Sequence, residues 1–559
     1  MYKEKYLAWK NHPNLDPKLR EELETLSESQ IEDAFYTDCR FQTAGMRGLL
    51  GVGTNRLNIH TVRKATYGYA RYLVDTCSEP KVAISYDNRH MSREFALDCA
   101  KILAGFGIRV YVAKVLKPTP ELSFMVRYYH CDGGIMITAS HNPKEYNGYK
   151  IYDREGCQLI PKLADKVIAY IDQIDDPLSI TVKDYDESLI ELVDKDIDEA
   201  YYAEVLKIRL RKDLDKDFKI VFSSEHGTSY EAVKETMKRA GYDLHPLMEQ
   251  CVPDPDFSKT ASPNPEVDSA YDGVMKLARE IGAELILITD PDGDRMGVAV
   301  KQDEDYVILN GNQTGAILLE YICMTRKEQG TLPANGCMFN TVVTSEFGNA
   351  VARKYGVDVE QTLTGFKYIG DKYHKYEENH EKEYVFGYEE SYGSLISPFV
   401  RDKDAVQACL MLAEACAYYR QFNKTLYDVI KEDYEQLGYY LDSQSSILLP
   451  GAQGEARLKQ LMKSFRESPL KTLAGYKVVK VEDYLLAQSQ ENGTVSPLEG
   501  FDRSDVLKYY LEDGSYLAIR PSGTEPKCKF YYCIKANDHE QALDKKRDFQ
   551  KDIDEIIGN

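Results

Sequence analysis

The chain has 559 residues, too many for one hydrophobic core, so about three or four domains are expected. Its composition, 43% hydrophobic and 29% charged, is typical of globular proteins and argues against a disordered or collagen-like chain. The net charge of −21 disfavours nucleic acid as a partner, because an acidic surface repels the phosphate backbone.

The N-terminal segment MYKEKYLAWK is charged throughout, and no run approaches the roughly 18 apolar residues of a membrane span. The 12 cysteines are scattered and contain no CxxC pair, which argues against a zinc framework or a dense disulfide scaffold. We therefore predict a cytoplasmic protein that does not bind membranes.

The first 40 residues predict peripheral helices, because residues 14–35 are charged and poor in strand formers, and we expect them to form a solvated surface layer. From Lys81 onward, short β-branched runs alternate with amphipathic segments: KVAISY, then SREFALDCAKILAGFG, then IRVYVA. The apolar run GGIMITA follows. Such alternation indicates an α/β sheet covered by helices.

The same alternation begins again near Lys219 and near Asn310, which predicts three α/β units in series. The second unit contains the strand ELILIT, and the third contains the long buried helix DAVQACLMLAEACAYYRQF. After about Leu437 the strands lengthen, and a charged helix closes the chain from about His539 to Ile557. Strands followed by a helix predict a smaller α+β domain.

Residues 137–150, ITASHNPKEYNGYK, contain the first chemical motif. Pro143 prevents a helix from starting at once, so we expect a loop that exposes Ser140 beside His141. A hydroxyl beside a base suits an activated nucleophile. The hydrolase pattern G-x-S-x-G is excluded, because Thr138 and Asn142 occupy the glycine positions. An ordinary turn with a hydrogen-bonded histidine is the alternative.

Residues 290–295, DPDGDR, place Asp290, Asp292 and Asp294 at the end of an apolar strand. Three convergent carboxylates suit a hard divalent cation, and Mg²⁺ fits best because it favours carboxylates together with a phosphate oxygen. An EF-hand is excluded, since Arg295 stands where glycine is required and Lys301 where glutamate is required. A solvated acidic turn is the alternative. Arg295 is placed to bind a phosphate that shares the metal.

Two further motifs carry polar side chains beside glycine. RPSGTEPK, residues 520–527, predicts an anion nest, and an ordinary turn is its alternative. FGYEESYGS, residues 386–394, suits sugar hydroxyls, with an acidic surface loop as its alternative. Two lesser loops, FQTAGMRG and TLTGFKYIG, each contain one cation, Arg47 or Lys367. The chain has no P-loop and no G-x-G-x-x-G, so the phosphate is expected to arrive on the substrate or on the protein.

These motifs, in this order, resemble the α-D-phosphohexomutase family, in particular its longer phosphoglucomutase and phosphopentomutase subgroup. The resemblance runs from TAGMRG at 43–48 to RPSGTEPK at 520–527. It implies an α/β protein of four domains around a central cleft: three related sandwich domains with mixed sheets and a smaller α+β C-terminal domain. The implied segments are an N-terminal helical extension at 1–40 and domains at 41–207, 208–308, 309–436 and 437–559.

The resemblance also implies a role for each motif. Ser140 matches the phosphoserine and completes a Mg²⁺ site formed by Asp290, Asp292 and Asp294. Either His141 or Lys150 would act as the general base and acid, and the sequence does not distinguish between the two. Arg47 would join these catalytic groups. The implied substrate-binding residues are Arg295, Thr364, Gly365, Lys367, Glu389, Ser391, Lys403, Arg520, Ser522, Gly523 and Thr524.

The implied reaction moves a phosphoryl group between Ser140 and a sugar phosphate, through glucose 1,6-bisphosphate as intermediate and activator. Ser391 is followed by Tyr392 and Gly393 rather than by the Gly-His of relatives with dual specificity, and it differs from the alanine of phosphopentomutase-leaning relatives. The resemblance therefore favours glucose phosphates, and mannose and pentose phosphates stay open. The alternatives within the family are a phosphomannomutase, a phosphopentomutase and a glucose 1,6-bisphosphate synthase. A metal-dependent phosphatase and a sugar-phosphate binder are the alternatives from other classes. A monomer or a homodimer is expected.

Overall fold

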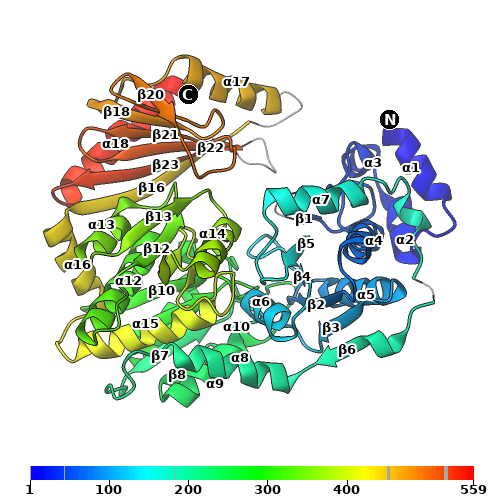
Figure 1. Cartoon of the computed structure of the whole chain (residues 1–559), viewed down its shortest axis with the longest axis horizontal. Helices are drawn as coiled ribbons and strands as arrows, with labels where there is room; N and C mark the ends of the chain where they lie inside the picture. Colours follow the sequence, from blue (N-terminus) through cyan, green and yellow to red (C-terminus); the bar gives the residue numbers. More distant parts are fainter. Residues whose placement is uncertain (1, 43–44, 183, 450–453, 522–526, 559) are drawn as a thin grey trace. The chain divides into compact units, whose positions relative to one another are not determined.

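The structure is a computed structural model that describes residues 2–42, 45–182, 184–449, 454–521 and 527–558 (Figure 1). The chain forms two compact units. The first comprises Met1–Gly311 and Phe366–Thr425, and the second comprises Asn312–Gly365 and Leu426–Asn559. Among the described residues, no helix is both long and apolar enough to cross a membrane. All 12 cysteines are free thiols.

The N-terminal extension is helical, as predicted, but it is not simply a solvated layer. Asp16 and Ser27 cap the second and third helices. Trp9, Leu23 and Phe35 turn inward into an apolar cluster, and Phe35 is fully buried. The segment is rich in charged residues overall, so its composition does not reveal the apolar face that packs in this cluster. Its helices are α1 (Tyr2–Asn11), α2 (Pro17–Thr25) and α3 (Glu28–Phe35).

A mixed six-stranded sheet follows, in the order β1-β5-β4-β2-β3-β6. Strands β2, β3, β4 and β6 are parallel, whereas β5 and β1 are antiparallel to their neighbours. The central strand β4 is buried at every position, as its apolar sequence requires. The strands are β1 (Met46–Leu49), β2 (Lys81–Tyr86), β3 (Arg109–Ala113), β4 (Gly133–Ile137), β5 (Tyr146–Asp153) and β6 (Ile190–Val193).

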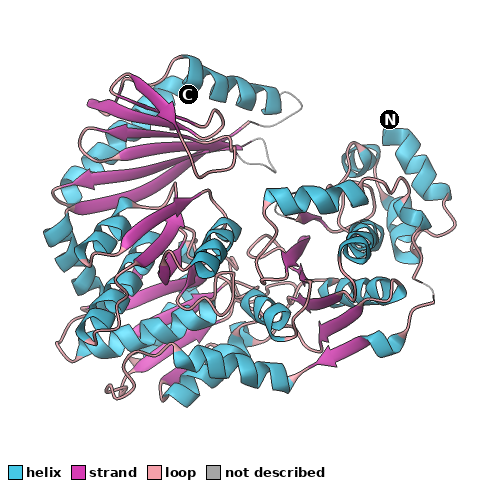
Figure 2. Cartoon of the chain, viewed as in Figure 1, coloured by secondary structure: helices cyan, strands magenta, loops and turns pink. Residues whose placement is uncertain are grey.

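Helices cover this first sheet (Figure 2). Helix α5 packs on β2, β3 and β4, helix α6 packs on β2 and β4, and α4 packs against α5 and α7. The helices are α4 (Ile59–Thr76), α5 (Ser92–Gly105), α6 (Thr119–Tyr128), α7 (Pro161–Ile171) and α8 (Lys195–Lys207), with 3₁₀ turns η1 (Pro177–Ser179) and η2 (Glu187–Leu189).

A second mixed sheet has the order β11-β10-β9-β7-β8, with β9, β7 and β8 parallel. Helix α11 packs on β7 and β9. The strands are β7 (Lys219–Ser223), β8 (Asp243–Pro246), β9 (Leu285–Thr289), β10 (Met296–Gln302) and β11 (Asp305–Leu309). The helical segments are α9 (Tyr230–Ala240), α10 (Met248–Cys251), η3 (Asp268–Tyr271) and α11 (Asp272–Ile281).

The first unit ends with α14 (Phe366–Asn379), β14 (Glu383–Tyr388), β15 (Ser394–Leu395) and α15 (Ala405–Arg420). Strands β14 and β15 are antiparallel. Helix α15 is buried on nearly every side, as predicted, and packs against α9, β9 and β10. Asp404 caps its first turn.

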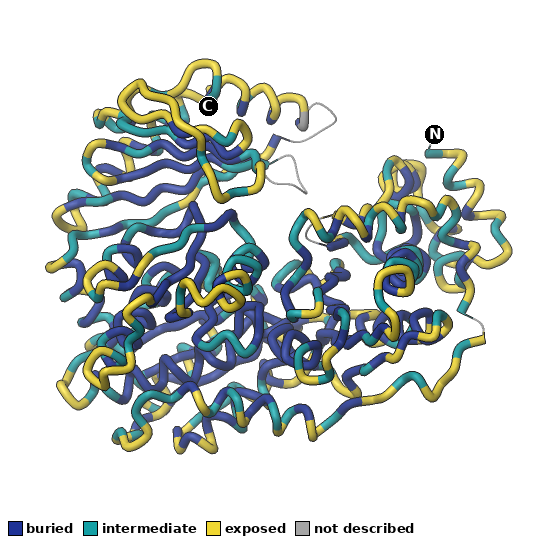
Figure 3. The backbone as a smooth tube through the Cα atoms, viewed as in Figure 1, coloured by how far each residue is buried: buried dark blue, intermediate teal, exposed yellow. Residues whose placement is uncertain are grey.

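The second unit takes in α12 (Gly311–Glu328) from Asn312 onward, the parallel strands β12 (Gly336–Thr341) and β13 (Asp358–Thr362), and the helices α13 (Glu346–Lys354) and α16 (Leu426–Leu437). Its C-terminal part is an antiparallel sheet in the order β16-β23-β22-β21-β18-β19-β20, with β17 paired to β18. The inner strands of this sheet are buried (Figure 3).

The C-terminal sheet carries two helices, and α18 packs on β16 and β23, so the predicted α+β arrangement is confirmed. The strands are β16 (Tyr439–Leu448), β17 (Thr472–Leu473), β18 (Tyr476–Asp483), β19 (Gln488–Glu491), β20 (Thr494–Pro497), β21 (Leu507–Leu511), β22 (Tyr516–Pro521) and β23 (Lys527–Ala536). The helices are α17 (Gly454–Glu467) and α18 (His539–Ile557).

One pattern of elements recurs three times along the chain. Strand, helix, strand, helix, strand and antiparallel strand follow one another as β2-α5-β3-α6-β4-β5, then β7-α9-β8-α11-β9-β10, then β12-α13-β13-α14-β14-β15. The predicted α/β fold with mixed sheets is therefore confirmed. In each repeat, the loop after the third strand contains one of the chemical motifs, with Ser140, Asp290 and Glu389 as examples. All three loops belong to the first unit.

Candidate active site

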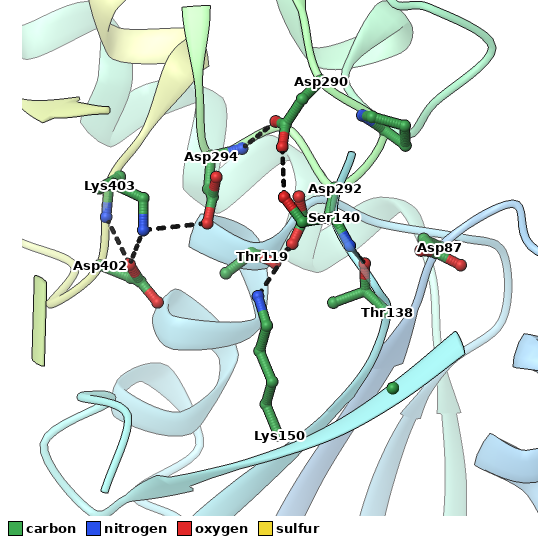
Figure 4. Close-up of polar contacts among 12 residues, drawn as sticks. Asp87, Thr119, Thr138, Ser140, Lys150, Asp290, Asp292, Asp294, Asp402 and Lys403 are labelled. Atoms are coloured by element: carbon green, nitrogen blue, oxygen red, sulfur yellow. Dashed lines mark hydrogen bonds and ion pairs between the residues drawn. The ribbon is translucent and has the colours of Figure 1, made fainter. Parts of the chain in front are cut away.

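Ser140 occupies a constrained turn just beyond β4. Its φ is 51°, in the left-handed region that a residue with a side chain rarely adopts. The Ser140 amide donates to Thr138 Oγ1 at 2.8 Å. The Ser140 hydroxyl donates to Asp290 Oδ2 at 2.6 Å (Figure 4). Ser140 is only 3% exposed, so the prediction of an exposed serine is wrong for this conformation. The aspartate loop, far away in sequence, packs against it.

Arg89 fixes the rest of the serine loop through its backbone. Its Nη2 donates to the carbonyl oxygens of Ser140, at 2.6 Å, and Asn142. Its Nη1 donates to the carbonyls of Pro143, at 2.8 Å, and Tyr146, at 3.0 Å. The Arg89 side chain is fully buried. A planar guanidinium can hold four acceptors in one fixed arrangement, so this residue sets the loop geometry.

The three aspartates of the DPDGDR loop converge. Asp290, Asp292 and Asp294 are buried, and one oxygen atom of each lies within 4.8 Å of the others. Burial, together with the charge of Asp292, raises the pKa of Asp290 and of Asp294. Asp292 Oδ1 and Asp294 Oδ1 have no hydrogen-bond partner in the described part of the chain. Clustered acids with such unused oxygens can bind a hard divalent cation.

Two lysines from different elements contact this cluster. Lys150, on β5, donates to Asp292 Oδ2 at 3.1 Å. Burial opposes ionisation of Asp292, but the charge of Lys150 prevails and lowers the pKa of that carboxyl. Lys403 Nζ lies 3.1 Å from Asp294 Oδ2 and 3.9 Å from Glu389 Oε2. Burial alone would lower the pKa of Lys403, but the surrounding acids raise it.

Gly393 makes room for the Lys403 side chain. A Cβ atom at position 393 would lie 1.9 Å from Lys403 Cδ, a distance that no side chain tolerates. The same glycine forms an isolated antiparallel bridge with Arg295. The Met296 amide also donates to the carbonyl oxygen of Tyr392 at 3.0 Å. The predicted sugar loop, which carries Glu389, is therefore joined directly to the aspartate loop.

His141 and Arg47 also contact the serine loop. His141 Nδ1 is 3.2 Å from Ser140 Oγ. Burial, together with the positive charges of Arg295 and Arg47, holds the pKa of His141 well below its usual range, so the imidazole is neutral at neutral pH. Arg47 donates from Nη1 to Asn142 Oδ1 at 2.7 Å. It lies on strand β1, not in the predicted loop, because β1 pairs with β5.

Arg295 has a partner that the sequence did not suggest. Its Nη1 donates to Glu266 Oε1 at 2.8 Å, and its Nε lies 3.7 Å from Asp294 Oδ1. Burial would lower the pKa of Arg295, but these acids raise it. Lys367 lies in the first turn of α14 and is buried, so its predicted loop position is wrong. The helix begins directly after Gly365, which has a φ of 114°.

The first unit therefore brings most of the predicted site together. Ser391 also belongs to it, beside Glu389. Thr364, Gly365 and Arg520 belong to the second unit, where Arg520 pairs with Lys529 across β22 and β23. The predicted phosphate-binding residues Ser522, Gly523 and Thr524 lie outside the described residues.

Family models match most of the chain. The three described as phosphoglucomutase/phosphomannomutase, alpha/beta/alpha domains I, II and III match residues 38–177, 199–303 and 310–437. The C-terminal domain model matches residues 461–548. The chain belongs to the phosphoglucomutase/phosphomannomutase family. It has all four of that family's domains, although the detailed boundaries stated above remain predictions.

Similar family members include two staphylococcal proteins named phosphoglucomutase. The protein from Staphylococcus epidermidis is 38% identical over 527 residues, covering 93% of this chain and 94% of that protein. The protein from Staphylococcus aureus is 37% identical over 528 residues, with the same coverage. The family assignment therefore rests on nearly the full length of both chains.

Solved structures agree in fold. An open form of parafusin, a phosphoglucomutase from Paramecium, aligns with a TM-score of 0.69 at 19% identity, covering 94% of this chain and 96% of that one. A phosphoglucomutase/phosphomannomutase family protein from Burkholderia thailandensis gives a TM-score of 0.68 at 16% identity, covering 93% and 98%. At these identities the likeness concerns the fold alone.

Proposed function

We propose that this enzyme is a phosphoglucomutase that interconverts glucose 1-phosphate and glucose 6-phosphate. The observation that carries the proposal is the buried contact between Ser140 Oγ and Asp290 Oδ2, at 2.6 Å, within a cluster of three aspartates. A binder has no need of a phosphorylatable hydroxyl at such a cluster. The staphylococcal relatives that share nearly the whole chain bear the same name.

In the proposed reaction, a phosphoryl group on Ser140 passes to the free hydroxyl of a sugar monophosphate. The hydroxyl oxygen bonds to phosphorus and its proton leaves to a base. The bond from phosphorus to Ser140 Oγ breaks, and Ser140 Oγ takes up a proton to become a hydroxyl. Glucose 1,6-bisphosphate then reorients and returns its other phosphoryl group to Ser140. When Mg²⁺ is bound by Asp290, Asp292 and Asp294, it neutralises charge on the transferring group.

We assign proton transfer at Ser140 to His141. Its Nδ1 lies 3.2 Å from Ser140 Oγ, which is within reach for direct proton transfer. Lys150 instead carries a positive charge against Asp292, 3.1 Å away, and suits stabilisation of the developing charge. Arg47 lies next to the same loop through Asn142.

The remaining proposed roles concern binding. Glu389 and Ser391 would accept hydrogen bonds from sugar hydroxyls, and Lys403 would hold Glu389 in place. The phosphate that does not react would bind in the C-terminal loop. The proposed substrate-binding residues are Arg295, Thr364, Gly365, Lys367, Glu389, Ser391, Lys403, Arg520, Ser522, Gly523 and Thr524.

Conversion of glucose 1-phosphate to glucose 6-phosphate tests the proposal directly. A coupled glucose 6-phosphate dehydrogenase assay with Mg²⁺ and a trace of glucose 1,6-bisphosphate is expected to report turnover that depends on the bisphosphate. Mannose 1-phosphate and ribose 1-phosphate are expected to react more slowly. If either sugar phosphate reacted faster than glucose 1-phosphate, that sugar phosphate would be the preferred substrate of the same mechanism. Net release of bisphosphate or of inorganic phosphate would instead identify the synthase or phosphatase alternative.

Arg89 provides a test of the serine loop. Replacement by lysine is expected to lower kcat about 100-fold, because one ammonium group cannot hold four carbonyls in a plane. KM is expected to change far less, since the substrate-binding groups are untouched. Steady-state kinetics with glucose 1-phosphate measure both quantities.

The matched control for Arg89→Lys is Arg63→Lys. Arg63 donates from Nε and Nη2 to the two carboxylate oxygens of Asp98, at 2.7 and 2.9 Å, and so joins α4 to α5. We expect Arg63→Lys to cost stability while leaving kcat near the wild-type value. Equal kinetic losses in the two variants would contradict a specific role for Arg89.

Size-exclusion chromatography addresses the expected monomer or homodimer.

A further inference from the structure

Two threonines from different parts of the first unit, Thr119 and Thr228, each donate hydrogen bonds to the aspartate loop through both the backbone amide and the side-chain hydroxyl. The Thr119 amide donates to the carbonyl oxygen of Asp292 at 2.8 Å, and the Thr228 amide donates to that of Pro291 at 2.9 Å. Both side chains are buried. The two hydroxyls differ in their acceptors. Thr228 Oγ1 donates to the Pro291 carbonyl at 3.0 Å, whereas Thr119 Oγ1 donates to the Asp292 carboxylate at 3.1 Å.

The position of Thr119 follows from the start of helix α6. Thr119 is the first residue of this helix, between Pro118 and Pro120, whose rings restrict the local backbone. Its amide has no acceptor within the helix, so the Asp292 carbonyl satisfies it. Gly293 allows this approach, because a Cβ atom there would lie 2.8 Å from Pro118 Cβ. The aspartate loop and the helix start are therefore fitted to one another.

The two oxygens of Asp292 have different surroundings. Oδ2 accepts from both Thr119 Oγ1 and Lys150 Nζ, each at 3.1 Å (Figure 4). Oδ1 is buried and has no hydrogen-bond partner among the described residues. Two donors on one oxygen fix the plane of the carboxylate and leave the other oxygen for a ligand. Groups that hydrogen-bond a metal-ligating carboxylate in this way set both its orientation and the metal affinity.

We propose that Thr119 is a positioning residue for the divalent cation, which acts by holding Asp292 with Oδ1 directed to the metal. The inference rests on the metal role in the proposed function, although it does not depend on which sugar reacts. Lys150 also holds Oδ2, but the proposed function assigns this lysine to stabilising the charge of the transferring group. The hydroxyl of Thr119 is uncharged and serves Asp292 alone as a side-chain donor, so its role here is to orient the carboxylate.

Direct Mn²⁺ binding to the full chain, followed by electron paramagnetic resonance, tests this proposal without relying on activity. Thr119→Val keeps the β-branched shape and the backbone contact but removes the hydroxyl, and it is expected to weaken Mn²⁺ binding about 10- to 100-fold. Thr119→Ser restores the hydroxyl and is expected to bind nearly as tightly as the wild type. The Mg²⁺ concentration for half-maximal turnover is expected to rise in parallel in Thr119→Val, with kcat at saturating Mg²⁺ much less affected.

Thr228→Val is the matched control. This variant also loses one buried hydroxyl that contacts the aspartate loop, and it keeps the backbone contact. The lost hydroxyl bonds the Pro291 carbonyl, so no carboxylate loses a donor. Unchanged Mn²⁺ affinity in Thr119→Val, or an equal loss in Thr228→Val, would overturn the proposal. Failure of Thr119→Ser to recover binding would also overturn it. A wild-type protein that binds no Mn²⁺ would instead contradict the metal site of the proposed function, and this inference with it.

Discussion

Replacement of Ser140 by alanine is expected to lower phosphoryl transfer by about four orders of magnitude or more. The reaction as proposed requires a covalent phosphoryl group on this oxygen, which is the hydroxyl that contacts Asp290. The substrate-binding groups remain, so the sugar phosphate should still bind. Bisphosphate-dependent turnover of glucose 1-phosphate measures the loss, and calorimetric titration with glucose 1-phosphate measures the retained binding.

A second buried serine controls for the removal of a hydroxyl. Ser515, in the other unit, is fully buried and donates to Asp513 Oδ2 at 2.9 Å. Ser515→Ala loses a similar hydrogen bond and is expected to be slightly less stable but fully active. Substantial turnover in Ser140→Ala, with an unfolding midpoint like that of the wild type, would contradict the phosphoserine mechanism.

Removal of the divalent cation is expected to have the second largest effect. Treatment with a chelator should stop turnover, and added Mg²⁺ should restore it, because the cation offsets charge on the transferring phosphoryl group. Asp292→Asn should lower activity at least about 100-fold, even at high Mg²⁺, since one anionic ligand is lost. Turnover measured against free Mg²⁺ concentration separates weaker binding from a lower maximal rate.

Asp433 supplies a control acid. It is buried, and it pairs with Lys354 at 2.8 Å in the second unit. Asp433→Asn is expected to lose stability without any change in the Mg²⁺ requirement. Full activity in the presence of excess chelator would contradict the metal role of Asp290, Asp292 and Asp294. The same conclusion would follow if Asp292→Asn and Asp433→Asn had equal effects on the Mg²⁺ dependence.

Much of the fold could be predicted from the sequence, because its signals are local. The β-branched runs became buried strands, and helix α18 spans His539–Ile557 as expected. The acidic motif was also recognisable, since three aspartates within five residues repel one another unless a cation binds. Their convergence in one buried cluster agrees with that expectation. Each of these predictions needed only neighbouring residues.

What the sequence did not predict depends on distant contacts. Thr119 lies 173 positions from Asp292, and Arg89 lies 51 positions from Ser140. Glu266 stands in no recognisable motif, and its contact with Arg295 is visible only in the structure. Nothing in the local pattern marks these residues as partners of the site, because threonine, arginine and glutamate are common in loops. Burial of Ser140 was missed for the same reason, since its cover comes from Asp290, 150 positions later.

Two positional errors have a simpler origin. Glycine near Arg47 and near Lys367 suggested loops, yet Arg47 lies on β1 and Lys367 lies in α14. Gly45, with a φ of 91°, directly precedes β1, and Gly365, with a φ of 114°, directly precedes α14. Each glycine therefore marks the start of a regular element, and the basic residue that follows it belongs to that strand or helix.

Transfer of labelled phosphate to and from Ser140 is the sharpest test of the phosphoserine mechanism. The protein would be incubated with glucose 1,6-bisphosphate carrying ³²P and Mg²⁺, then digested, and the labelled peptide identified. We expect the label on the peptide that contains Ser140, and we expect unlabelled glucose 1-phosphate to remove it into sugar bisphosphate. Label on another residue, or label on Ser140 that the sugar cannot remove, would contradict the account.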